Sequence, residues 1–446
     1  MENYKYIIFK ILTLFKTKNR NTMSSEFEQN LDKYADIILK VGLNLQQGQR
    51  LLIGVVNPIN QGTPLELASF IQLIVRKAYQ MGAKFVEVMW DDPQLQLIRL
   101  QYAPRDSFEE ISTWRKEAAL EYMTKGDAIF AVLAQDPELF NDQDPELIIT
   151  QRRSISAHYK PIKDLLVKNT TNWALVAAPV NGWADKIFPE LPSNKQNIKL
   201  WNTIFEICRV KQEDPVSSWR DHINNLKTRC NFLNEKQYEA LKLVAPGTDL
   251  TIGLPKGHIW RGGSLTSQNG ITFVANLPTE EIFTMPDKNK TQGRVRATKP
   301  LFFGNALIED FSFTFSEGKV VEANAGNGKE YLEKFIQFDE GASYLGEIAL
   351  VSHSSPISQS GLLFYNGLID ENASIHIALG SAYKFSIENG EEMSDEEFAQ
   401  VGGNTSILHM DFMIGSGEIN IDGIREDGAV EPIMRNGEWA FDVSPK

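Results

Sequence analysis

The residues best suited to chemistry lie near the C-terminus, in the segment 406–415. We expect this segment to be a strand, in which alternate side chains share a face, so that His409 and Asp411 point together. An imidazole beside a carboxylate can bind a divalent metal ion. Taken alone, the pair is better explained by a buried hydrogen bond between aspartate and histidine.

Three further segments place acidic side chains beside apolar residues or a histidine. They are 370–376 with Glu371 and His376, the apolar run 345–351 with Glu347, and 278–283 with Glu280 and Glu281. Each has an ordinary explanation: an acidic helix start, a buried carboxylate paired with a base, or a solvated acidic pair. Because adjacent side chains diverge, one of Glu280 and Glu281 is expected to enter a site while the other faces away.

Together these segments indicate a metal site more strongly than each does alone. Two of only six histidines fall within them. Imidazole nitrogens combined with carboxylate oxygens are ligands for zinc, cobalt or manganese. A single zinc takes about four ligands, whereas five or six donors suggest two ions. A water shared by two cations becomes a nucleophile near neutral pH, so the pattern predicts a hydrolytic metal site.

The N-terminal half contains elements that alternate between helix and strand. We expect helices over 31–45, 63–82 and 108–125, and strands over 51–56, 84–90, 128–134 and 173–178. This order predicts a mainly parallel sheet with right-handed crossovers. No glycine-rich phosphate-binding loop follows these strands, so a nucleotide site is not supported.

After about residue 245 the sequence changes character. Turn pairs such as Asn269-Gly270 separate short alternating runs, which predicts antiparallel sheet with hairpins. Helices are expected over 329–338 and 373–385, and the second would place His376 and Tyr383 two turns apart on one face. We therefore predict two domains, an α/β domain over 23–245 and an α+β metal-binding catalytic domain over 246–446.

Composition limits the partners and the compartment. Of 446 residues, 45 are basic and 58 acidic, giving a net charge of −13, which argues against a nucleic-acid partner. Two cysteines, Cys208 and Cys230, are typical of a reducing, cytoplasmic location. The apolar stretch near the N-terminus is too short to cross a membrane. We interpret residues 1–22 as an extension, disordered or upstream of a true start at Met23.

In six ordered blocks the chain resembles the thermophilic metallo-aminopeptidases of family M29, which include aminopeptidases S, T and II. The blocks are 278–284, 297–301, 344–347, 355–358, 370–376 and 409–415. The resemblance implies two divalent ions per subunit (zinc, cobalt, manganese or magnesium), with Glu347 as the bridge between them. The other implied ligands are Glu281, Glu371, His376, His409 and Asp411, and Tyr383 matches a tyrosine beside the metals.

The resemblance also implies the reaction, which is hydrolysis of N-terminal residues from peptides with broad side-chain preference, by a homodimer. A free carboxylate must carry the proton from water to the leaving amine, and Glu280 is our candidate because it neighbours a ligand. Tyr383 is our candidate donor to the oxyanion. Two alternatives stay open: a related metal-dependent dipeptidase or amidohydrolase, and a non-enzymatic metal-binding module. Two histidines already argue against calcium in such a module, because calcium prefers oxygen ligands.

Overall fold

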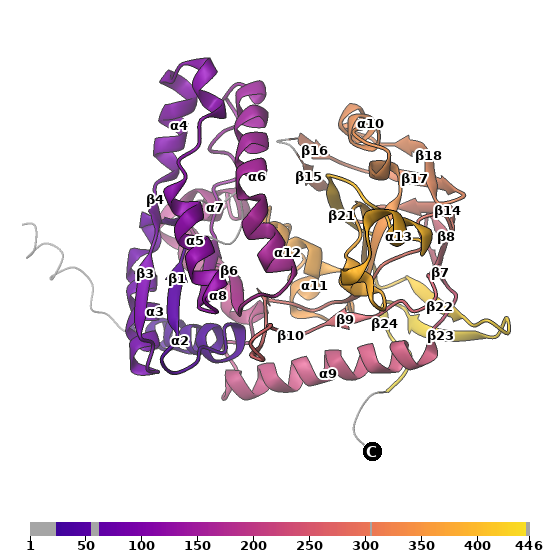
Figure 1. Cartoon of the computed structure of the whole chain (residues 1–446), viewed down its shortest axis with the longest axis horizontal. Coiled ribbons are helices and arrows are strands. Elements are labelled where there is room, and N and C mark those ends of the chain that lie inside the picture. Colours follow the sequence, from indigo (N-terminus) through magenta and orange to yellow (C-terminus); the bar gives the residue numbers. More distant parts are fainter. Residues whose placement is uncertain (1–23, 55–61, 304–305, 443–446) are drawn as a thin grey trace, which may run out of the picture.

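The computed structural model describes residues 24–54, 62–303 and 306–442; the extension predicted for residues 1–22 lies outside these ranges. Two lobes stand side by side, the N-terminal one in indigo and magenta and the C-terminal one in orange and yellow (Figure 1). Helix α9, Pro215–Lys236, runs beneath both lobes. Its Trp219 and Ile223 pack into the core of the first lobe, and its Leu226 and Leu233 pack into the core of the second. One helix therefore joins the two cores.

The first lobe contains the predicted parallel sheet, in the order β12-β6-β5-β1-β3. Its strands are β1 Arg50–Ile53, β3 Phe85–Val88, β5 Ala128–Leu133, β6 Trp173–Ala177 and β12 Asn276–Leu277. Leu51 and Ile53 pack into one apolar core, whereas Leu52 between them packs into another on the opposite face. Burial on both faces explains the unbroken apolar runs of these strands.

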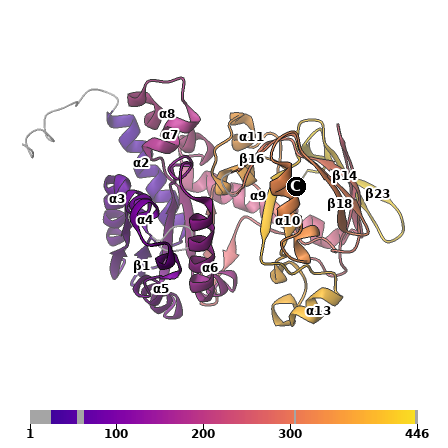
Figure 2. The same cartoon turned by 90° about the horizontal axis from the view of Figure 1, so that it is seen from above.

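Helices cover both faces of this sheet (Figure 2). They are α2 Ser24–Ile37, α3 Ala68–Gln80, α4 Pro93–Tyr102, α5 Trp114–Thr124, α6 Pro145–Val167, α7 Asn181–Ile187 and α8 Ser193–Ile207. The predicted helix start at Thr63 is wrong. Thr63 and Pro64 instead form strand β2 beside β4 (Trp90–Asp91), with the Thr63 N–H donating to the Met89 carbonyl, and α3 begins at Ala68. Among the described residues, no helix is both long and apolar enough to span a membrane.

The second lobe contains antiparallel sheet, as predicted for this half, and its two main sheets pack face to face. The larger sheet contains β7 Ala240–Ala245, β8 Thr248–Gly253, β14 Thr291–Arg296, β17 Ser312–Ser316, β18 Lys319–Asn324, β22 Asn420–Ile424, β23 Val430–Arg435 and β24 Glu438–Trp439. The smaller contains β9 Arg261–Gly262, β13 Ile282–Thr284, β19 Leu345–Leu350, β20 His376–Gly380 and β21 His409–Met413. Phe313 of the larger sheet meets Phe412 of the smaller, with ring centroids 5.1 Å apart.

Short elements complete this lobe: β10 Leu265–Thr266, β11 Thr272–Phe273, β15 Leu301–Phe303, β16 Ala306–Ile308, α10 Lys329–Ile336, α11 Pro356–Ser360, α12 Gly367–Asp370 and α13 Asp395–Gln400. The helix predicted over 329–338 is confirmed by α10. The helix predicted over 373–385 is wrong, because its centre is β20, paired with β19 and β21. The buried run from His376 to Gly380 gains a hydrogen-bonded neighbour on each side, which outweighs local helix propensity.

Candidate metal centre

One face of the smaller sheet in the second lobe gathers the predicted donors. Glu347 of β19, Ala378 of β20 and Asp411 of β21 are register partners in a row, and Gly380 pairs with His409. Register partners share a face, and Ala378 and Gly380 between the polar side chains leave room for them. On the other face, residues such as Ile348, Ile377, Met410 and Phe412 fill the apolar core. The predicted alternation at His409 and Asp411 is confirmed.

These donors form two groups that share one carboxylate. In the first, the Nε2 atom of His376 lies 3.1 Å from Glu281 Oε2 and 3.8 Å from Glu347 Oε1. In the second, the Nε2 atom of His409 lies 3.3 Å from Asp411 Oδ1 and 3.5 Å from Glu347 Oε2. Within each group, the donor atoms lie within 4.8 Å of one another. Glu347 offers one oxygen to each group, which is the arrangement that a bridging ligand requires.

Backbone carbonyls orient both imidazoles for cation binding. His376 Nδ1 lies 3.1 Å from the Ser374 carbonyl oxygen, and His409 Nδ1 lies 2.7 Å from that of Ser381. A carbonyl only accepts, so each Nδ1–H donates and each Nε2 faces the carboxylates, where it can bind a cation once it has lost its own proton. Metal-binding histidines are commonly oriented in this way. Apart from its ion pair with His376, the buried Glu281 Oε2 has no hydrogen-bond partner, so the donor set fits a divalent cation.

The cluster is expected to release protons when it binds metal. Burial opposes the charged form of His409, yet Asp411 and Glu347 raise its pKa to about 10. Burial likewise opposes the charge of His376, but Glu281 and Glu347 raise its pKa well above the ordinary value. Both imidazoles therefore carry protons near neutral pH before a cation binds, and a cation must displace them.

Metal affinity should accordingly rise with pH through the neutral range. Titration calorimetry in buffers of different ionisation enthalpy measures the protons released, and His409→Ala is the matched variant, expected to release fewer. An affinity and a proton count that do not change with pH would contradict this prediction.

Glu371 and Tyr383 line the same cavity but lie outside the two groups. Burial raises the pKa of Glu371 well above its usual range, and the charges of Glu281 and Asp411 raise it further. Burial, with the nearby charge of Glu347, also raises the pKa of Tyr383. The Tyr383 ring stacks on Phe385, with centroids 5.1 Å apart, and lies 5.2 Å from the ring of His409. Its predicted place on a helix with His376 is wrong, although both residues reach one cavity.

The structure places Glu280 away from the cavity, although its neighbour Glu281 lines it. Arg209, from the loop after α8, donates from both terminal nitrogens to the two carboxylate oxygens of Glu280, one bond measuring 2.8 Å. Only 4% of the Glu280 side chain and 16% of the Arg209 side chain are exposed. Because this ion pair holds the Glu280 carboxylate on the side of the turn opposite to Glu281, the carboxylate does not reach the metal-binding side chains. The prediction of Glu280 as general base is therefore not supported by its position.

The first lobe supplies a wall of the cavity that sequence reasoning missed. The cavity has a volume of about 290 Å³, and Lys163 and Leu166 of α6 and Trp173 of β6 line it together with the acidic cluster. These residues lie more than 100 positions before Glu281, and no spacing or motif marks them. Strand β12 brings the two parts together, because Asn276 and Leu277 pair with β6 only a few residues before Glu281.

The comparisons with known proteins agree with this geometry. The sequence model of the thermophilic metalloprotease family M29 matches residues 27–439. The chain belongs to family M29. It is 42% identical to "Aminopeptidase 2" of Geobacillus stearothermophilus, over 94% of this chain and 100% of that protein. It is also 42% identical to "Aminopeptidase AmpS" of Bacillus subtilis (strain 168), over 93% and 99%.

A solved structure of an M29 relative has the same fold. The structure titled "Wild-type AmpT from Thermus thermophilus" superposes with a TM-score of 0.87 at 37% identity, covering 93% of this chain and 100% of that chain. The resemblance inferred from the six blocks and the predicted fold class are both confirmed. As an M29 metallopeptidase the chain is a hydrolase of peptide bonds, and its cluster of glutamate, histidine and aspartate side chains is suited to divalent metal.

Proposed function

We propose that this M29 peptidase is an aminopeptidase that holds two divalent cations and removes N-terminal residues from peptides of varied sequence. The observation that carries the proposal is the sharing of Glu347 between two groups of donors. Glu281 and His376 would hold the first cation with Glu347, while His409 and Asp411 would hold the second. When bound, such a pair lowers the pKa of a water and polarises a carbonyl. Zinc, cobalt, manganese and magnesium all suit these donors.

The rest of the cavity supports cleavage at a free N-terminus. A free α-amino group would be held by one of the cations or by Glu371, and a cavity of about 290 Å³ restricts how much chain it can enclose. Leu166, Trp173, Phe283 and Phe385 line it with apolar surface. Such surface discriminates weakly between side chains, which is consistent with a broad preference.

Glu371 and Tyr383 are proposed to assist at the reacting bond. We propose Glu371 as a further ligand through one oxygen. Its other oxygen would carry the proton to the leaving amine. Another carboxylate is needed for this role because Arg209 holds Glu280 away from the cavity. Burial raises the pKa of Glu371, which suits a carboxyl group that takes up and passes on a proton. Tyr383 keeps its hydroxyl proton because its pKa is raised, so it can donate a hydrogen bond to the oxyanion.

The test compares substrates with and without a free amino group. Purified protein with cobalt or zinc should hydrolyse leucine-p-nitroanilide but not N-acetyl-leucine-p-nitroanilide. A chelator should abolish the activity, and added metal should restore it. Turnover of dipeptides but not of longer peptides would instead indicate a dipeptidase, turnover of N-acyl amino acids an amidohydrolase, and metal binding without any turnover a binding module. Metal content of the active protein, measured by atomic emission, gives the number of ions.

We also propose a homodimer of chains, each divided into the domains 23–245 and 246–446, working in the cytoplasm. Helix α4 of the first lobe exposes one apolar face: Leu95 is 63% exposed, Ile98 51% and Tyr102 79%. These residues recur at helical spacing, and a second copy of the chain would cover them. Ile98→Glu should shift the sedimentation coefficient from that of a dimer toward that of a monomer, whereas Lys160→Glu on α6 should not. A monomeric parent protein, or a dimer that tolerates Ile98→Glu, would contradict this surface.

A further inference from the structure

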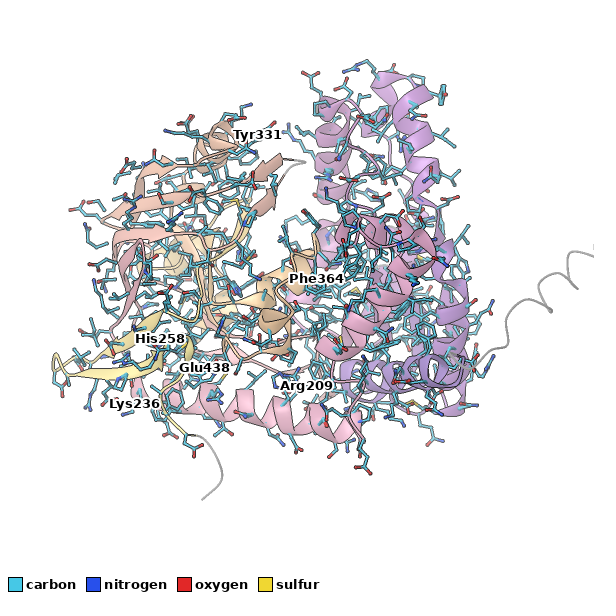
Figure 3. The ribbon with its side chains drawn as sticks, turned by 180° about the vertical axis from the view of Figure 1, so that it is seen from behind. Arg209, Lys236, His258, Tyr331, Phe364 and Glu438 are labelled. Atoms are coloured by element: carbon cyan, nitrogen blue, oxygen red, sulfur yellow. The ribbon has the colours of Figure 1, made fainter. Side chains whose placement is uncertain are left out.

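A buried ion pair anchors the turn that carries Glu281. The turn is 278–281, between strands β12 and β13, and Arg209 holds the Glu280 carboxylate with two hydrogen bonds. Arg209 has a φ of 57°, a left-handed conformation that a non-glycine residue adopts when its surroundings impose it. It lies beside α9, where the lobes meet (Figure 3). The pair thus links the loop between α8 and α9 to the turn that carries Glu281.

Two more contacts fix the backbone of the same turn. His222 of α9 donates from Nε2 to the Thr279 carbonyl oxygen at 2.9 Å, and its Nδ1 then accepts from Arg209 Nη2 at 3.3 Å. On the other side, the Glu280 N–H donates to Asn372 Oδ1 at 2.7 Å. Asn372 directly follows Glu371 in the chain. One network therefore holds the residues that precede Glu281 and the residue beside Glu371.

We propose that Arg209 and Glu280 are positioning residues that set the separation of Glu281 and Glu371 for cation binding, an inference that rests on the proposed two-cation function. Neither residue lines the cavity. Their effect passes through the backbone of the turn, since the Glu280 side chain is anchored on one side of it and Glu281 projects from the other. Outer contacts of this kind commonly change metal affinity by about 10–100-fold when they are removed.

The experiment measures cation affinity separately from catalysis and from folding. Glu280→Gln, Arg209→Lys and Arg209→Gln are compared with Asp127→Asn, which breaks another largely buried pair, that of Arg50 and Asp127 at 2.6 Å in the first lobe. Zinc affinity comes from competition with a chromogenic chelator, stability from the Tm of the metal-free protein, and kcat and KM from assays at limiting and saturating metal. Glutamine has nearly the same size as glutamate. Glu280→Gln therefore still tests the proposal if Arg209→Gln fails to fold.

We expect Glu280→Gln and Arg209→Gln to weaken the binding of at least one cation about 10-fold or more. Arg209→Lys should retain part of the affinity because it keeps the charge. At saturating metal, kcat for Glu280→Gln should return to within a few-fold of the parent value. Asp127→Asn should lower the Tm and leave the affinity unchanged.

Two results would overturn the inference while leaving the proposed function intact. One is parental cation affinity in Glu280→Gln with only a lower Tm, which would make the pair structural. The other is a kcat for Glu280→Gln that stays low at saturating metal with parental affinity, as for a general base. A parent protein that binds no cations would instead overturn the proposed function, and this inference with it.

Discussion

Replacing Glu347 with alanine is expected to remove both cations and lower kcat/KM by about 1,000-fold or more. Glu347 supplies one oxygen to each group of donors, so its loss leaves Glu281 with His376 on one side and His409 with Asp411 on the other. Two protein donors are too few to hold a divalent cation tightly, and Glu371 can add a third donor to only one of these pairs, without the shared carboxylate that holds the two cations together. A 1,000-fold loss corresponds to about 4 kcal/mol of transition-state stabilisation, which is within what bound metal contributes.

Single-group variants should give a graded result. His376→Ala affects only the first group and Asp411→Asn only the second, so each should retain about one cation per chain at metal concentrations that saturate the parent. Emission analysis after gel filtration gives these contents, and leucine-p-nitroanilide turnover gives the rates. Glu431→Gln is the control, because Glu431 is a carboxylate paired with Lys236 at 2.5 Å, far along the larger sheet.

The comparison among these variants decides whether Glu347 is shared. If Glu347→Ala loses one cation and keeps the other at parental affinity, the carboxylate serves one group and the bridging assignment is wrong. If Glu347→Ala, His376→Ala and Asp411→Asn all keep the parental metal content and rate, the site lies elsewhere. Circular dichroism of each variant separates loss of metal from loss of fold.

Replacing Tyr383 with phenylalanine is expected to lower kcat by about 100-fold while metal content stays unchanged. Removing one donor to an oxyanion commonly costs about 100–1,000-fold. Burial and the charge of Glu347 raise the pKa of Tyr383, so the parent hydroxyl keeps its proton through the neutral and mildly alkaline range. The phenyl ring can still stack on Phe385, so the loss should fall on kcat rather than on stability.

A second tyrosine provides the matched control for this measurement. Tyr331 on α10 is 40% exposed and lies at the top of the second lobe (Figure 3), and Tyr331→Phe should leave kcat and KM unchanged. A Tyr383→Phe variant with parental kcat would remove the proposed role. A variant that instead loses bound metal would show that Tyr383 supports the ligands and not the oxyanion.

Local sequence pattern was sufficient to predict many of the strands and several residues of the metal centre. Unbroken apolar runs such as 128–134 predicted strands, and the structure covers both faces of the strand there, so its side chains avoid water whichever way they point. The alternation at His409 and Asp411 predicted their common face, since a strand has a period of two. The rarity of an unpaired buried carboxylate drew attention to Glu347. The resemblance to family M29 implied which of these side chains bind metal together.

The alternating N-terminal sheet, the face shared by His409 and Asp411 and the residue types of the centre all follow from local pattern. How the two halves meet depends on long-range contacts. Strand pairing on both sides made 376–380 a strand, Arg209 turned Glu280 away from the cavity, and α6 supplied a wall. Each of these outcomes depends on contacts with residues far away in the chain. The energy of such contacts outweighs local conformational preference, and the spacing of neighbouring residues does not reveal them.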